Sequence, residues 1–158
     1  MIHDVPPLLV EKLTNIINSS KLLIRLTVQP FFIYIKPEII GEGLSPDISL
    51  LVNVVKDSLS KHRIILKDSA SICDYVIVLK ANYRKGGELY GQFTTYVDFS
   101  ISVISRNDAA GLLELSFSEN KGVALDYNAA ALKALQKIKT KLDSSTFLRI
   151  FDRISGRS

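Results

Sequence analysis

The sequence predicts an α+β fold, a two-layer sandwich in which helices pack on one face of a mostly antiparallel sheet. Three observations predict it. Apolar and polar residues alternate over residues 97–103 and again over 113–117, which is the period of half-buried strands. Between these runs, residues 106–111 contain the Asn, Asp and Gly that favour a chain reversal. Helical periodicity flanks this strand-rich region rather than alternating with its strands.

The first third of the chain predicts a helix and two short strands. Pro6 and Pro7 favour a helix start, and the apolar spacing that follows predicts an N-terminal helix within residues 1–20. Residues 22–28 alternate as a strand, and residues 31–35 form a second β-rich run. Pro30 between them indicates either two strands or one strand broken at an edge, because proline cannot donate to a central ladder. Pro37 is expected to close the second run.

The middle of the chain predicts a helix between strands. Ser45 suits an N-cap and Pro46 a first helical position, so residues 47–61 are predicted to be helical. Residues 63–66 form the next predicted strand. The run 74–81 is almost entirely apolar, which is typical of a central strand covered on both faces.

The last part of the chain predicts a hairpin followed by two helices. Residues 83–92 are the most exposed segment by composition, and residues 84–88, with Gly86 and Gly87, are expected to form a turn. After the strands 91–105 and 111–118, Asp126 suits the N-cap of an alanine-rich helix that ends near Leu142. A short terminal helix capped by Ser144 and a frayed tail at 154–158 complete a single predicted domain, residues 1–158.

Composition excludes few classes of function. The net charge is +4 and the pI is about 9.2, but the basic residues are scattered. The densest group, Lys133, Lys137, Lys139 and Lys141, lies on one predicted helix and is expected to be a solvated face, with contact to an anionic surface as the alternative. No apolar run reaches the roughly 20 residues of a membrane span. The start of the chain lacks the features of a signal peptide, so the protein is expected to be cytoplasmic unless an export signal was removed.

Catalytic and cofactor motifs are not evident. Cys73 is the single cysteine and is expected to be a small buried hydrophobe. His3 and His62 are too few to form a zinc site, and Gly41 and Gly43 lack the rest of a phosphate-binding loop. We therefore expect no cofactor, no metal and no catalytic residue.

Two alternatives remain open from the residues alone. Asp74 and Asp98 both lie on predicted strands and would suit a small hydrolase if neighbouring strands brought them together. Tyr83, Tyr90 and Tyr96, with nearby basic residues, would suit a small nucleic-acid-binding domain through an aromatic and basic platform.

The order of elements resembles a family of bacterial envelope lipoprotein domains. That family includes the curli-secretion lipoprotein, the penicillin-binding-protein activator lipoproteins and the flagellar T-ring protein. The resemblance rests on the strand entry at 69–77, with its Ala70 and Asp74-Tyr75, on the hairpin that follows, and on the glycine-containing step into the alanine-rich helix. The turn at 106–111 keeps only part of the family's pattern, and no lipobox cysteine precedes the domain.

The resemblance implies a non-catalytic binding or scaffolding module that contacts another envelope protein or a copy of itself. It also implies a periplasmic or outer-membrane-associated location. We expect the contacts to lie on an exposed sheet edge and on the segment 83–92. Deleting residues 84–88 is expected to leave the fold intact and to weaken partner binding. The candidate partner-binding residues are Tyr83, Arg84, Lys85, Glu88 and Tyr90.

Overall fold

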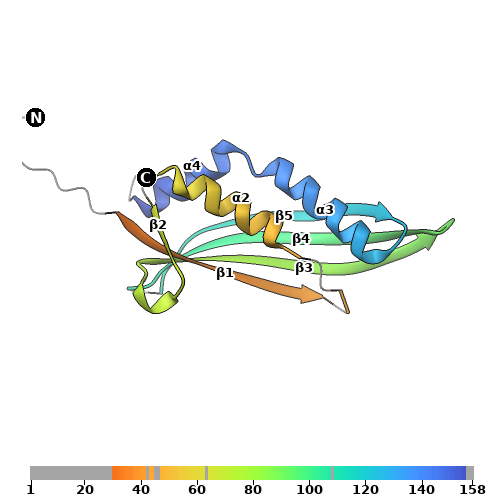
Figure 1. Cartoon of the computed structure of the whole chain (residues 1–158), viewed down its shortest axis with the longest axis horizontal. Helices are drawn as coiled ribbons and strands as arrows, with labels where there is room; N and C mark the ends of the chain where they lie inside the picture. Colours follow the sequence, from red (N-terminus) through yellow and green to blue (C-terminus); the bar gives the residue numbers. More distant parts are fainter. Residues whose placement is uncertain (1–29, 42, 45–46, 63, 108, 156–158) are drawn as a thin grey trace, which may run out of the picture.

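A five-stranded sheet with three α-helices on one of its faces forms the described part of the chain (Figure 1). The computed structural model describes residues 30–155, except for residues 42, 45–46, 63 and 108. The predicted N-terminal helix within 1–20, the predicted strand at 22–28 and the predicted caps Ser45 and Pro46 lie outside the described residues. The elements are β1 (Phe31–Gly41), α2 (Ser49–Ser60), β2 (Ile64–Lys67), a 3₁₀ turn (Ala70–Ile72), β3 (Tyr75–Leu89), β4 (Gln92–Ser105), β5 (Gly111–Ala124), α3 (Tyr127–Lys141) and α4 (Ser144–Ile154).

The strand order is β2-β1-β3-β4-β5. The three longest strands form an antiparallel meander, in which β3 pairs with β4 and β4 with β5. β1 is parallel to both of its neighbours, because α2 carries the chain back to the end of the sheet where β1 began. The sheet is therefore mostly antiparallel, and the predicted α+β sandwich is confirmed.

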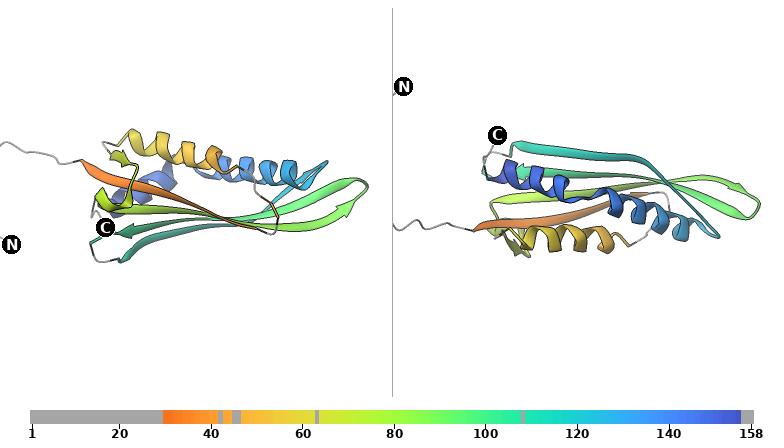
Figure 2. Two further views of the ribbon diagram at one scale, coloured as in Figure 1. Left: turned by 60° about the horizontal axis from the view of Figure 1, so that its bottom comes forward. Right: turned by 90° about the horizontal axis from the view of Figure 1, so that it is seen from above.

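The described helices all lie on one face of the sheet, as Figure 2 shows. On this covered face, β4 contributes four fully or almost fully buried side chains: Val97, Phe99, Ile101 and Val103. The residues between them point to the open face and are half-buried. The predicted alternation of β4 is confirmed. β3 is central, as predicted, but the expectation that both its faces are covered is wrong, because no described helix packs on the second face.

The alanines of α3 allow this helix to approach the sheet closely. Ala130, Ala131 and Ala134 are fully buried. Gly122 of β5 lies directly beneath, and a Cβ there would overlap the carbonyl oxygen of Ala130. Asp126 caps the helix as predicted, because its Oδ1 accepts a hydrogen bond from the Ala129 N–H at 2.7 Å.

Carboxylates also accept backbone hydrogen bonds at the starts of the other two helices. In α2 the N-cap residue is Ile48, which makes no side-chain cap, and Asp47 precedes it. Asp47 Oδ1 accepts a hydrogen bond from the Ser49 N–H at 2.7 Å, at the start of α2. Asp143 caps α4 by accepting from the Thr146 N–H at 2.9 Å, so the expected cap at Ser144 is wrong. An aspartate competes well with a serine for this position. Ile154, which was expected to belong to the frayed tail at 154–158, ends α4 and is buried, and residues 156–158 lie outside the described residues.

Pro37 does not close the first described strand, contrary to expectation. β1 runs through it to Gly41 and pairs with β3 along this whole stretch. β2 pairs with β1 only as far as Tyr34, so the strand has an unpaired outer side at Pro37. A missing N–H costs nothing on that side, which is why proline is tolerated there.

Candidate functional site

The hairpin of β3 and β4 extends beyond the helix layer and ends in a two-residue turn (Figure 1). Tyr90 and Gly91 have φ values of 50° and 70°, and Leu89 pairs with Gln92 across them. Positive φ at both central residues is the type I′ geometry that fits the right-handed twist of paired strands. Tyr90 is 96% exposed and Leu89 is 68% exposed. We call residues 86–92 the hairpin tip.

The glycine pair lies within β3 and not at the turn, so the predicted turn over 84–88 is wrong. Gly86 and Gly87 sit where the register shifts between Lys85 and Glu88, which makes a β-bulge. A Cβ on Gly86 would come within 2.9 Å of the Thr94 Cγ2 atom, so close strand packing requires glycine there. Gly91, which the sequence analysis left out of the turn, supplies the positive φ that the reversal needs.

The stem of the hairpin is braced by the first residue of α3. The Tyr127 ring packs against Phe93 with the ring centroids 4.8 Å apart, and the Lys85 ammonium lies 5.3 Å from the centroid of the same ring. The Thr95 hydroxyl donates a hydrogen bond to the Tyr127 carbonyl oxygen at 2.9 Å. The tip therefore projects from a stem that is fixed to the helix layer.

The five predicted partner-binding residues do not share one surface. Glu88 and Tyr90 are exposed at the tip, Lys85 faces the helix layer, and Arg84 lies on the open face. Tyr83 is only 2% exposed and belongs to the core. Burial raises the pKa of its phenol, and among the described residues its hydroxyl is a buried polar group without a hydrogen-bond partner. Leu89 is exposed at the tip but is not among the five predicted residues. It is detectable in the sequence as the large apolar residue directly before Tyr90-Gly91.

Asp98 has a structural role at a bulge in β5. Its carboxylate accepts a hydrogen bond from the Glu119 N–H at 2.7 Å and another from the Arg84 guanidinium at 3.1 Å. Glu119 has a φ of 54°, and the register between β4 and β5 shifts at this point. The buried Asn120 amide donates to the Phe117 carbonyl oxygen at 2.8 Å. Together these bonds satisfy the backbone groups that the bulge removes from the ladder.

The structure does not bring Asp74 and Asp98 together. Asp74 directly precedes Tyr75 at the start of β3, whereas Asp98 pairs with Asn82. Positions 74 and 82 are eight residue steps apart along β3, a separation of roughly 26 Å in an extended strand. Asp74 is occupied in a backbone contact, accepting from the Phe32 N–H at 2.9 Å. The hydrolase alternative that required this carboxylate pair is therefore wrong.

The aromatic platform is not assembled either. Tyr83 faces the core, Tyr96 lies on the open face beneath the Arg84 guanidinium, and Tyr90 is at the turn. Single-stranded nucleic acid needs aromatic rings that follow one another along a single groove. This arrangement does not provide such a groove, so the nucleic-acid-binding alternative loses its aromatic support.

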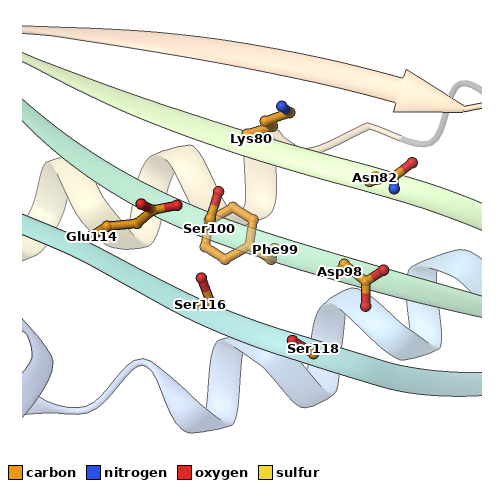
Figure 3. A pocket seen from close by; sticks show the side chains of 8 residues that line it. All are labelled: Lys80, Asn82, Asp98, Phe99, Ser100, Glu114, Ser116 and Ser118. Atoms are coloured by element: carbon orange, nitrogen blue, oxygen red, sulfur yellow. The ribbon is translucent and has the colours of Figure 1, made fainter.

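The open face carries a shallow hollow of about 210 Å³, drawn in Figure 3. Seven of its eight lining residues have polar or charged side chains, and the eighth is Phe99: Lys80, Asn82, Asp98, Phe99, Ser100, Glu114, Ser116 and Ser118. These groups would suit hydrogen bonds to a polar surface, but the hollow is open and too small to enclose a cofactor. The described residues include no group of three metal-ligating side chains, and none of the described helices is long and apolar enough to span a membrane.

The other reactive residue types are accounted for by packing. Cys73 is buried, as its sequence context predicts, and its thiol donates to the Ala70 carbonyl oxygen. The His62 ring stacks against Phe151 with centroids 5.1 Å apart, at the end of α2. Neither side chain faces a described acid or base that would activate it.

Comparison with known proteins identifies the fold. A crystal structure of a DUF330 protein from Xanthomonas campestris aligns with 15% identity over 81% of this chain and 90% of that one, with a TM-score of 0.51. The two chains share a fold. Lipoprotein GNA1162 from Neisseria meningitidis aligns with 13% identity, 71% and 96% coverage and a TM-score of 0.46. A minor lipoprotein from Acinetobacter baumannii aligns with 10% identity, 82% and 94% coverage and a TM-score of 0.39.

No family model and no curated protein matches the sequence. At such low identity the structural likeness establishes the fold and transfers neither an activity nor a ligand. The narrower resemblance to the curli-secretion, penicillin-binding-protein activator and T-ring group stays a prediction.

Proposed function

We propose that this domain is a non-catalytic binding module of a bacterial cell envelope, and that it contacts another envelope protein through its hairpin tip. The observation that carries the proposal is the exposed pair Leu89 and Tyr90, held at the end of a braced two-stranded stem. Large apolar side chains presented on a rigid element are typical anchors of protein–protein contacts. An isolated tip of this kind has no evident role in the stability of the domain itself.

Two further observations support the proposal. The four side chains that the sequence singled out for chemistry, Asp74, Asp98, Cys73 and His62, each have a structural partner, which supports a non-catalytic role for them. The fold shared with the DUF330 protein from Xanthomonas campestris supports the architecture that the resemblance implies, whereas the envelope location rests on the resemblance alone. The location of the protein stays a proposal, and fractionation of the source cells would test it. Recovery in the cytosolic fraction alone would contradict the envelope assignment.

The contact is best tested by substitution. Deleting residues 84–88 would remove five residues from β3 alone and put the hairpin out of register, so it would damage the fold. The double variant Leu89→Ser, Tyr90→Asn changes only exposed side chains, and asparagine tolerates the positive φ at the turn. Leu148→Ser, which removes a 50% exposed apolar side chain from α4, is the matched control.

The measurement is quantitative affinity capture from envelope extracts, followed by mass spectrometry. We expect the recovery of a specific partner to fall roughly tenfold or more with the tip variant, since anchor residues each contribute above about 1 kcal/mol. Recovery should be unchanged with Leu148→Ser. Equal recovery with all three proteins would contradict a role for the tip.

A further inference from the structure

The outer side of β5 changes character half-way along the strand. In its second half, the Lys137 ammonium donates to the Lys121 carbonyl oxygen at 2.7 Å, and the Lys133 ammonium donates to the Val123 carbonyl oxygen at 3.0 Å. These two lysines extend from α3 around the sheet edge. Charged side chains that occupy edge carbonyls prevent a further strand from pairing there.

In the first half of β5, residues 111–118, no described lysine covers the outer carbonyls in this way, and we call this half the free edge. Figure 2 shows it as the outermost strand, running beside α4 and not beneath it. Along an edge strand, every second residue directs its backbone N–H and C=O groups away from the sheet, and the extra residue of the bulge at Glu119 changes which residues do so. Beyond the bulge, the backbone carbonyls of Lys121 and Val123 point outward. In the free edge, the residues with outward backbone groups are therefore Leu112, Glu114, Ser116 and Ser118.

The opposite edge of the sheet is protected in other ways. β2 has only four residues. Beyond it, the outer side of β1 contains Pro37, which offers no N–H to an incoming strand. Short edge strands and edge prolines are the usual devices against strand addition. Within the described sheet, the free edge is thus a continuous stretch of unpaired strand without any of these devices.

We propose that the free edge pairs with the free edge of a second copy of this chain, as an antiparallel dimer with its two-fold axis at Leu115. This inference deepens the proposed function and rests on it, because it treats the domain as an interaction module. It concerns a surface separate from the hairpin tip. The two five-stranded sheets would join into one continuous sheet across the axis.

The side chains of the free edge are self-complementary in this register. On the covered face, Leu115 would meet Leu115 of the partner, and the half-buried Leu113 would meet the half-buried Phe117. On the open face, Glu114 would lie opposite Ser116, whose hydroxyl can donate to the carboxylate.

Neighbouring registers are disfavoured by charge or by the bulge. Shifting the pairing by one step toward the start of β5 would place Glu114 directly opposite Glu114, and like charges facing each other are destabilising. A shift the other way would place the bulge at Glu119 opposite Leu113 and interrupt the ladder. The two-fold axis at Leu115 avoids both.

The test is the oligomeric state of the full chain, measured by sedimentation equilibrium over roughly a hundredfold concentration range. We expect a reversible monomer–dimer equilibrium. Ser116 is exposed, so it can be replaced without disturbing the core. Ser116→Glu would face Glu114 of the partner, whereas Ser116→Lys would form an ion pair with it. We expect the dimer dissociation constant to differ about tenfold between these two variants, with Ser116→Glu the weaker.

A charge swap completes the test. Adding Glu114→Lys to Ser116→Glu places opposite charges across the axis again and should restore dimerisation, while the midpoint of urea unfolding of the monomer stays similar in all variants. A chain that remains monomeric, forms a larger assembly, or responds equally to Ser116→Glu and Ser116→Lys would overturn the proposal. Because purified protein with an intact tip is used, such a failure leaves the partner contact of the tip untouched.

Discussion

The two faces of the sheet use the same strands for different purposes. Along β4, Phe99 is 2% exposed and packs beneath the helices, whereas its neighbour Ser100 lies half-buried on the open face and lines a polar hollow. The covered face holds almost the whole apolar core, so it determines stability. No described helix packs on the open face, so its polar side chains contribute little packing, apart from Asp98 with its bonds at the β5 bulge. Interaction surfaces in this molecule are therefore expected at the tip and the free edge, where the core ends.

The largest expected effect compares two adjacent residues of β4. Phe99→Ala should destabilise the domain by about 3–5 kcal/mol, because it leaves a cavity in the packed layer. Ser100→Ala should change the free energy of unfolding by less than about 0.5 kcal/mol. Urea denaturation followed by circular dichroism measures both. Similar losses for the two variants would show that the open face also carries packing.

The next prediction compares two glycines. Gly122→Ala should cost about 3 kcal/mol, because the new methyl group would push α3 away from β5 at the Ala130 carbonyl. Gly87→Ala is the matched control, since a Cβ at Gly87 meets nothing within 4 Å, and its φ is not positive. The same denaturation experiment applies. A neutral Gly122→Ala would mean that the helix layer can slide on the sheet.

The smallest expected effect concerns Asp143, the carboxylate that caps α4. The Thr146 N–H, followed by the Ser145 and Thr146 hydroxyls, lowers the pKa of the Asp143 carboxyl below its ordinary 3.8. A lowered folded-state pKa means that the carboxylate stabilises the protein above pH 3.8 and that this contribution is lost as the pH falls through the folded-state value. Asp143→Asn keeps an N-cap but cannot titrate.

Stability measured as a function of pH separates these cases. As the pH falls into the acid range, the free energy of unfolding of the native chain should decrease slightly more than that of Asp143→Asn. Near neutral pH, the two free energies should differ only by a constant amount that does not depend on pH. Parallel curves throughout the acid range would remove Asp143 from the pH response.

Much of the architecture could be predicted from local patterns. The alternation over 97–103, the reversal at 106–111, the alanine-rich helix and its Asp126 cap all correspond to observed elements. These features depend on residues close in the chain, so periodicity and capping chemistry reveal them. The prediction that Pro37 ends its strand failed because it also used only neighbouring residues. Such a rule cannot say whether another strand pairs with the outer side of the strand at that position.

The candidate site was predicted less well. The sequence pointed to the segment 83–92, but it placed the turn at Gly86-Gly87 and grouped Tyr83 with exposed residues. Gly86 is required by contact with Thr94 on the neighbouring strand, and Tyr83 is buried because β3 continues its alternation beyond the apolar run. Both facts depend on cross-strand register, which is a long-range property.

By itself, the sequence determined that this chain forms strands with one apolar face and helices to cover it, because side-chain periodicity is written in neighbouring residues. Only the tertiary structure decided which segments remain uncovered. Lys133 and Lys137 of α3 protect half of β5, and along the other half α4 runs beside the strand without a described side chain that bonds to its outer carbonyls. Exposure of an edge is a property of what packs beside it, and no local pattern contains that information.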